Sequence, residues 1–157
     1  MNAKQWLGRG RWIEREIAAL MRTRDETRDR LTKITQSYDG DGAQSTKDPH
    51  KFDALVEMED KLDAAIDKLY QTKNEILSAI GQLEDGRERI ALTMYYVTVY
   101  DTEPQYDEKN REKERRMITW EDVASKQHYT WRQMMRIKKA AYAHMEDVIS
   151  CHIGGVV

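Results

Sequence analysis

Apolar residues recur every seven positions along the first part of the chain. They are Trp6, Ile13, Leu20 and Ile34, with Thr27 filling the remaining step and Ile17 and Leu31 on the same side. This repeat predicts a helix over residues 3 to about 37 with a 3.5-residue apolar seam, as in a coiled coil. Gly8, Gly10 and Arg24 fall within the pattern, and we expect them to weaken the seam.

A polar segment, residues 39–49, then breaks the repeat. Gly40 and Gly42 favour turns, Asp48 suits a helix N-cap, and Pro49 suits the first turn of a helix. A cleaner repeat follows and predicts a helix over about 50–82: Leu55, Leu62, Leu69 and Ile76, flanked by Phe52, Ile66 and Ile80. Two helices of similar length with a short polar connection predict a long antiparallel helical hairpin.

The next segment is mixed in character. Glu84, Asp85 and Gly86 resemble a helix entry, and a helix is expected over 87 to about 100, although residues 95–100 are β-branched and aromatic enough for a strand. Residues 101–116 are strongly charged, contain Pro104 and lack an apolar pattern. We expect them to form a solvated linker, with a short helix as an option at the basic end.

Two further helices with a tight connection are predicted after residue 117. Thr119 can cap the first, and Asp122 stands where a capping box would place an acidic or amide side chain. Residues 126–129 connect them, and Thr130 can cap the second helix, 131 to about 149. A short amphipathic helix, a turn of about four residues and a basic second helix form the layout of a helix-turn-helix.

The second of these helices divides into an apolar face and a presented face. The apolar face carries Met134, Ile137, Ala141, Tyr142 and Met145. Arg132 or Arg136 suits a bidentate contact with guanine, whereas Lys138 and Lys139 suit phosphate. The expected DNA-binding residues are Trp120, Thr130, Trp131, Arg132, Gln133, Met135, Arg136, Lys138 and Lys139. The alternative is an ordinary amphipathic helix with a solvated basic face.

The amino-acid composition is typical of a helical protein. The chain has 157 residues, of which 34% are charged and only 10 are Gly or Pro (8 and 2), which favours an all-α protein. The net charge of −2 means that any DNA-binding surface must be local. We expect no membrane span or signal peptide. The single Cys151 and the scattered His50, His128, His144 and His152 offer no metal or cofactor site, and without a catalytic motif we expect no enzyme.

The C-terminal segment resembles the fourth conserved region of bacterial sigma factors, the helix-turn-helix that reads a promoter element. Residues 118–124 match its supporting helix, and residues 129–134, 136–137 and 141–145 match its recognition helix. The whole layout resembles small phage and prophage regulators akin to late-transcription activators and the autolysin regulatory protein. The charged insertion 101–116 is longer than the link expected in this group. Trp131 and Met135 also stand where polar residues are commoner.

The resemblance implies a phage-encoded DNA-binding transcription regulator, acting on late genes in the bacterial cytoplasm without a cofactor. We expect residues 1–82 to form the hairpin, as a homodimerisation or RNA polymerase docking module. Residues 83–150 would form the DNA-binding domain, and residues 151–157 a tail. Two alternatives stay open: the small subunit of a DNA-packaging terminase, and a helical adaptor that does not bind DNA.

Overall fold

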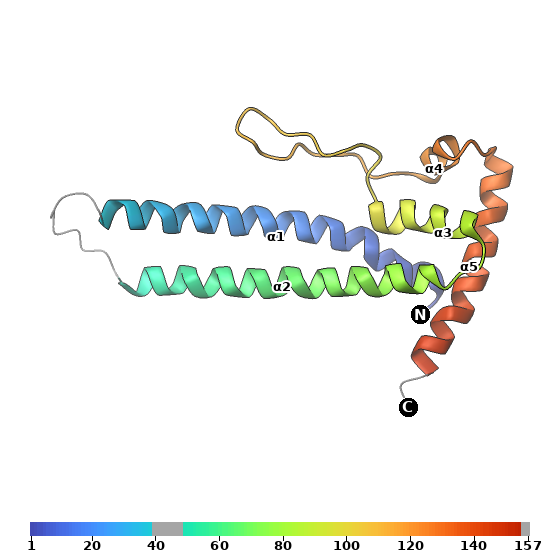
Figure 1. Cartoon of the computed structure of the whole chain (residues 1–157), viewed down its shortest axis with the longest axis horizontal. Helices are drawn as coiled ribbons and strands as arrows, with labels where there is room; N and C mark the ends of the chain where they lie inside the picture. The colour runs from blue at the N-terminus through green and yellow to red at the C-terminus, as the bar shows by residue number, and fades with distance from the viewer. Residues whose placement is uncertain (39–48, 155–157) are drawn as a thin grey trace. The chain divides into compact units, whose positions relative to one another are not determined.

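The computed structural model describes residues 1–38 and 49–154, and within them every regular element is helical (Figure 1). The expected all-α class is therefore confirmed, since the described residues contain two isolated β-bridges and no strand. The predicted Asp48 cap and the turn glycines Gly40 and Gly42 lie outside the described residues. The elements, in chain order, are α1 (Ala3–Tyr38), α2 (Pro49–Gly81), α3 (Gly86–Leu92), η1 (Thr93–Thr98), α4 (Trp120–Lys126) and α5 (Trp131–Gly154).

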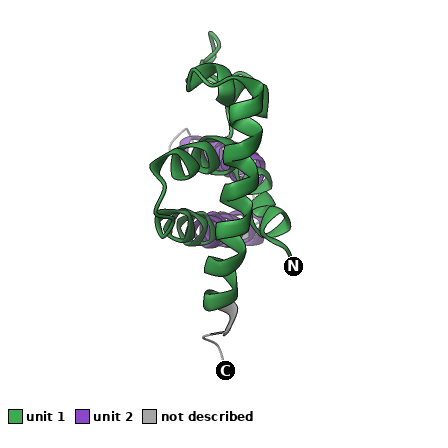
Figure 2. Ribbon diagram, turned by 90° about the vertical axis from the view of Figure 1, so that its right-hand side faces the viewer, with its two compact units in different colours: residues 1–14, 72–157 green, residues 15–71 purple. Residues whose placement is uncertain are grey.

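The chain divides into two compact units, coloured separately in Figure 2. One, which we call the paired-helix unit, comprises residues 15–71. The other, which we call the terminal unit, combines residues 1–14 with residues 72–157. Both long helices contribute to both units. The boundary therefore lies within α1 and α2, and the start of α1 belongs with the C-terminal elements.

In the paired-helix unit, ion pairs show that the two helices run antiparallel. Arg24 contacts Asp63 at 3.3 Å, and four residues further along α1, Arg28 contacts Glu59, four residues earlier on α2. Ile17 and Ile66 are buried. Thr27 is buried as well. Its polar hydroxyl is tolerated there because it donates a hydrogen bond to the Thr23 carbonyl at 2.9 Å.

The terminal unit holds the larger core. Its fully buried side chains come from the five α-helices and from the segments that follow η1 and precede α4: Leu7, Ile76, Ile80, Leu92, Val99, Ile118, Val123, Met134 and Met145. Helix α5 packs along α3 and α4. At its C-terminal half, Glu146 accepts a hydrogen bond from the Ala3 amide at 2.7 Å, and His152 contacts Gln82 at 3.1 Å. These bonds attach α5 to the first turn of α1 and the end of α2.

The segment with mixed helix and strand character is helical, but it is wound as a π-helix. The Val99 amide donates to the Met94 carbonyl at 3.0 Å, five residues back, and the helix ends at Thr98. Val99 has a φ of 69°, in the left-handed region that β-branched residues rarely adopt. Its fully buried side chain and the hydrogen bond from the Ile118 amide to its carbonyl hold it there.

Residues 101–116 form an irregular excursion, and the optional short helix at its basic end is wrong. Antiparallel bridges join Tyr100 to Met117 and Tyr106 to Glu112. At the tip, the Asp107 carboxylate accepts from the Arg111 amide at 2.8 Å, and Asn110 adopts a φ of 57°. The basic end is extended because its backbone pairs with the first half of the excursion. The Lys113 amide, for example, donates a hydrogen bond to the Gln105 carbonyl.

Candidate nucleic-acid interface

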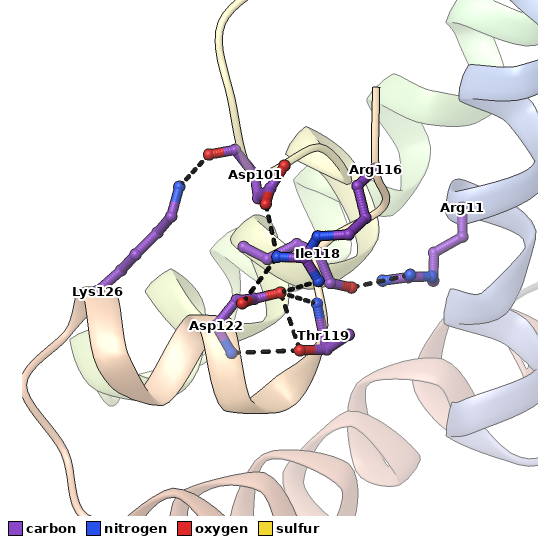
Figure 3. A network of polar contacts seen from close by, with 7 residues as sticks. All are labelled: Arg11, Asp101, Arg116, Ile118, Thr119, Asp122 and Lys126. Carbon is purple, nitrogen blue, oxygen red and sulfur yellow. Dashed lines mark hydrogen bonds and ion pairs between the residues drawn. The ribbon is translucent and has the colours of Figure 1, made fainter. Parts of the chain in front are cut away.

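Helix α4 begins with the capping box that the sequence predicts. The Asp122 amide donates to the Thr119 hydroxyl at 3.3 Å, and the Thr119 amide donates to the Asp122 carboxylate at 2.8 Å. Arg116 bridges the Asp122 and Asp101 carboxylates (Figure 3). The Arg116 guanidinium and the Thr119 donors lower the pKa of Asp122 to about 2, so this cap stays ionised at neutral pH.

The connection between α4 and α5 is a Schellman turn with histidine where glycine is usual. The Tyr129 amide donates to the Ala124 carbonyl at 2.8 Å, and the His128 amide donates to the Ser125 carbonyl at 3.2 Å. His128 has a φ of 58°. Glycine is preferred at this position because the Cβ of any other residue makes the left-handed backbone conformation costly. The turn is therefore made without glycine, at some cost in stability.

Replacing His128 by glycine should stabilise the protein by about 0.5 to 1 kcal/mol, because the left-handed backbone is then free of strain. His128→Ala is the matched control, since it removes the imidazole but keeps Cβ. Urea denaturation of the three proteins measures the difference. An Ala variant as stable as the Gly variant would show that the imidazole, and not the backbone, is responsible.

Helix α5 begins at a second capping box. The Gln133 amide donates to the Thr130 hydroxyl at 3.3 Å, and the Thr130 amide donates to the Gln133 side-chain oxygen at 2.9 Å. The predicted cap Thr130 is therefore confirmed. Of the predicted apolar face, Met134, Ala141 and Met145 are buried, and Ile137 and Tyr142 are half-buried. This fixes which side of α5 faces the core.

Four side chains, one each from α1, η1, α4 and α5, form a stack that connects these elements. The Arg11 guanidinium lies 4.0 Å from the centre of the Tyr95 ring, Tyr95 stacks on Trp120 at 4.2 Å, and the Lys138 ammonium lies 5.0 Å from the Trp120 ring. Arg11 also donates to the Tyr95 and Ile118 carbonyls, both at 2.9 Å. The stack is a structural clamp on the start of α4.

The clamp changes the roles expected for Trp120 and Lys138. The Trp120 side chain is buried in the aromatic cluster, where it packs rather than faces a phosphate. Lys138 is half-buried, and desolvation lowers the pKa of its ammonium. Because this ammonium lies over an aromatic ring, it is less available to a phosphate than the neighbouring Lys139, which is exposed.

The exposed face of α5 carries three cationic side chains. Arg132, Arg136 and Lys139 are exposed and lie at helical spacings of four and three residues, hence on one side. Among the residues that the structure describes, none of the three has an ion-pair partner. Trp131 at the start of the helix is 49% exposed, and Met135 is half-buried.

Several other cations of the terminal unit are engaged within the protein. Arg87, Arg111, Arg115 and Arg116 each pair with a carboxylate, and Lys126 donates to the Asp101 carbonyl (Figure 3). An engaged cation has part of its charge and its donors satisfied before any ligand arrives. Arg132, Arg136 and Lys139 therefore keep their donors available to a polyanion, as do the exposed Lys4, Lys109 and Lys113 elsewhere in the unit.

A shallow groove of about 370 Å³ borders this face, and sequence reasoning missed it. It is lined by Asp85, Arg87, Glu88, Tyr129, Gln133, Arg136, Ile137 and Ala140. Asp85 caps α3 and binds Arg87 at 3.0 Å, and the hydrogen bonds from Arg87 lower the pKa of Asp85. The sequence indicated a helix entry at Glu84, Asp85 and Gly86, but only the packing of α3 on α5 makes Arg87 and Arg136 line the same groove.

A buried carboxylate in the lining of this groove is held by a histidine. Glu88 is only 3% exposed, and one of its carboxylate oxygens lies 2.8 Å from His144 Nδ1. This hydrogen bond, followed by the charge of Glu88, raises the pKa of His144 above its ordinary value; Asp147 and Asp85 add smaller contributions. The pair attaches α3 to α5 more strongly when the imidazole is protonated.

The pair should make stability depend on pH. Because the pKa of His144 is raised in the folded state, its contribution is full below the unfolded pKa of about 6.5 and is lost as pH rises through the folded value. The difference in free energy of unfolding between wild type and His144→Asn should therefore shrink from about pH 6 to about pH 9. Urea denaturation across this range measures it. A constant or growing difference would contradict the assignment.

Comparisons with family models, with curated proteins and with solved structures found no match to this chain. In the described part of the chain, no helix is long and apolar enough to span a membrane. The same residues contain no cluster of three or more His, Cys, Asp or Glu side chains arranged to hold a metal ion. Functional inference therefore rests on the geometry of α4 and α5.

Proposed function

We propose that the chain binds double-stranded DNA through α5, as the recognition helix of a helix-turn-helix. The observation that carries the proposal is one exposed face with Arg132, Arg136 and Lys139, none of which has an ion-pair partner in the described part of the chain. The two capped helices and the tight turn between them support it, because this layout presents the second helix to a major groove. Arginine at such a position suits guanine.

We further propose that the protein is a transcription regulator of phage genes, similar in action to a detached sigma region four. The support is the resemblance of residues 118–145 to that region, together with the two caps at Thr119 and Thr130. Three cations without an ion-pair partner among the described residues face outward from α5, which favours a modest affinity of one copy of the helix. A second copy or RNA polymerase would then supply the remaining affinity.

The paired-helix unit is our candidate for self-association. Its seam residues Leu55, Leu62 and Leu69 are only half-buried, while Phe52, Val56, Met58 and Tyr70 on the same helix are 37–41% exposed. Pairing with a second copy would cover such apolar surface. The same surface also suits the ring of a terminase small subunit. The mass in solution separates the two: a dimer supports the regulator, and a larger ring supports the packaging protein.

The DNA-binding proposal is tested by fluorescence anisotropy with a labelled duplex of mixed sequence. We expect binding that weakens with salt, with a slope of log K against log salt of about −3 if the three cations contact phosphates, and somewhat less if one of them contacts a base. A single strand of the same sequence is the control, and it should bind less tightly. Failure to bind any duplex at about 50 mM salt would overturn the proposal and leave the adaptor alternative.

A further inference from the structure

Resting on the proposed DNA binding, we infer that the groove between α3 and α5 holds one phosphodiester of the DNA backbone, clamped by Arg87 and Arg136. Arg87, Tyr129, Gln133 and Arg136 all line this groove, and Arg136 also belongs to the exposed face of α5. A recognition helix in the major groove lies between two phosphate backbones. Cations at its flank are therefore placed for phosphate rather than for base edges.

Arg87 belongs to α3, outside the helix-turn-helix proper. Its side chain is 64% exposed, and its Nε and one Nη bind the Asp85 carboxylate at 3.3 and 3.0 Å. A guanidinium has five N–H donors in a planar fork, so these two bonds leave donors for a phosphate oxygen. The Asp85 contact lowers the local positive charge at Arg87.

The acidic residues of the groove are both engaged. Asp85 accepts from the Arg87 backbone amide at 2.8 Å as the cap of α3, and Glu88 is buried against His144. Arg136 has no ion-pair partner among the described residues and supplies the unbalanced charge. An arriving phosphate would thus meet the Arg136 guanidinium, which has no ion-pair partner among the described residues. It would also meet the Arg87 guanidinium, whose partner Asp85 already accepts a hydrogen bond from the Arg87 backbone amide.

The inference assigns different roles to the two arginines of α5. Arg136 lines the groove with Arg87, whereas Arg132 does not line it and lies one turn nearer the start of the helix. The N-terminal residues of a recognition helix are the ones that reach base edges. Arg132 is therefore the specificity-determining residue, and Arg136 with Arg87 sets the register of the protein on the backbone.

The test compares Arg87→Ala with Arg111→Ala on wild-type background. Arg111 is a matched control, because it is 69% exposed and binds Asp107 through Nε at 3.2 Å in the charged excursion. For Arg87→Ala we expect about tenfold weaker binding on every duplex sequence and a salt slope reduced by about 0.9, and for Arg111→Ala little change. Arg87→Lys should keep the slope, since it keeps the charge.

Asp85→Asn adds a variant that does not depend on a loss of function. Asparagine still caps α3, but it no longer neutralises Arg87, so binding to all duplexes should become tighter. Equal affinities and slopes for wild type, Arg87→Ala and Arg111→Ala would overturn the inference while the wild type still binds DNA. A sequence-dependent loss in Arg87→Ala would overturn it too. Absence of wild-type binding would instead remove the proposed function.

Discussion

Replacing Gly10 by alanine is expected to destabilise the protein by about 2 kcal/mol, although alanine is the better helix former. A Cβ at Gly10 would lie far inside van der Waals contact of the Tyr96 carbonyl oxygen and close to the Tyr96 carbonyl carbon, both backbone atoms of η1. Backbone cannot rotate away as a long side chain can, so α1 would have to move off the π-helix. The Arg11 hydrogen bonds to the Tyr95 and Ile118 carbonyls would be strained by the same movement.

Gly8, one half-turn earlier on α1, provides the matched control. Nothing lies within 4 Å of a Cβ built there, so Gly8→Ala should stabilise the protein by about 0.5 to 1 kcal/mol through helix propensity alone. Chemical denaturation followed by circular dichroism measures both variants. Two alanine variants shifted in the same direction would contradict the close approach of α1 to η1.

Removing Arg132 and Arg136 together should abolish most of the DNA binding. Each forms a charge-assisted contact in the proposed complex, and the loss of two such contacts lowers affinity by about 100-fold or more. Both side chains are exposed and unpaired among the described residues, so the double alanine variant should unfold at the same temperature as the wild type. Anisotropy titration with duplex DNA, alongside a thermal melt, gives both quantities.

The control for this variant removes the same amount of charge elsewhere. Lys109 and Lys113 are exposed in the charged excursion, so Lys109→Ala with Lys113→Ala also lowers the net charge by two. We expect at most a small, salt-dependent loss of affinity from it. A loss of affinity equal to that of the arginine pair would mean that DNA binding depends on the net charge of the protein and that α5 has no special part in binding.

Local signals in the sequence predicted most of the helices. The seven-residue repeats located α1 and α2 to within a residue or two, because coiled-coil periodicity is carried by the residues themselves. Thr119 and Thr130 likewise marked the starts of α4 and α5, since a cap depends on neighbours three residues away. These features need no knowledge of the tertiary fold.

What the sequence could not indicate depends on contacts between distant residues. Gly10 looked like a weakness in a helix, and only the approach of Tyr96 shows why a side chain is excluded there. Nothing in the sequence singles out Glu88, which the packing of α3 on α5 buries against His144. A helix was expected at Thr93–Thr98 with a strand as the alternative, but its π-helical winding was not predicted from the β-branched and aromatic residues there.

Selection of binding sites from a random pool of DNA duplexes, followed by sequencing, tests most directly whether α5 reads DNA. With wild-type protein we expect one enriched sequence that includes a required guanine. With Arg132→Ala the preference for that guanine should disappear while the neighbouring positions persist. A pool that shows no enrichment with the wild type, or the same guanine preference with Arg132→Ala, would contradict the role of α5 as a recognition helix.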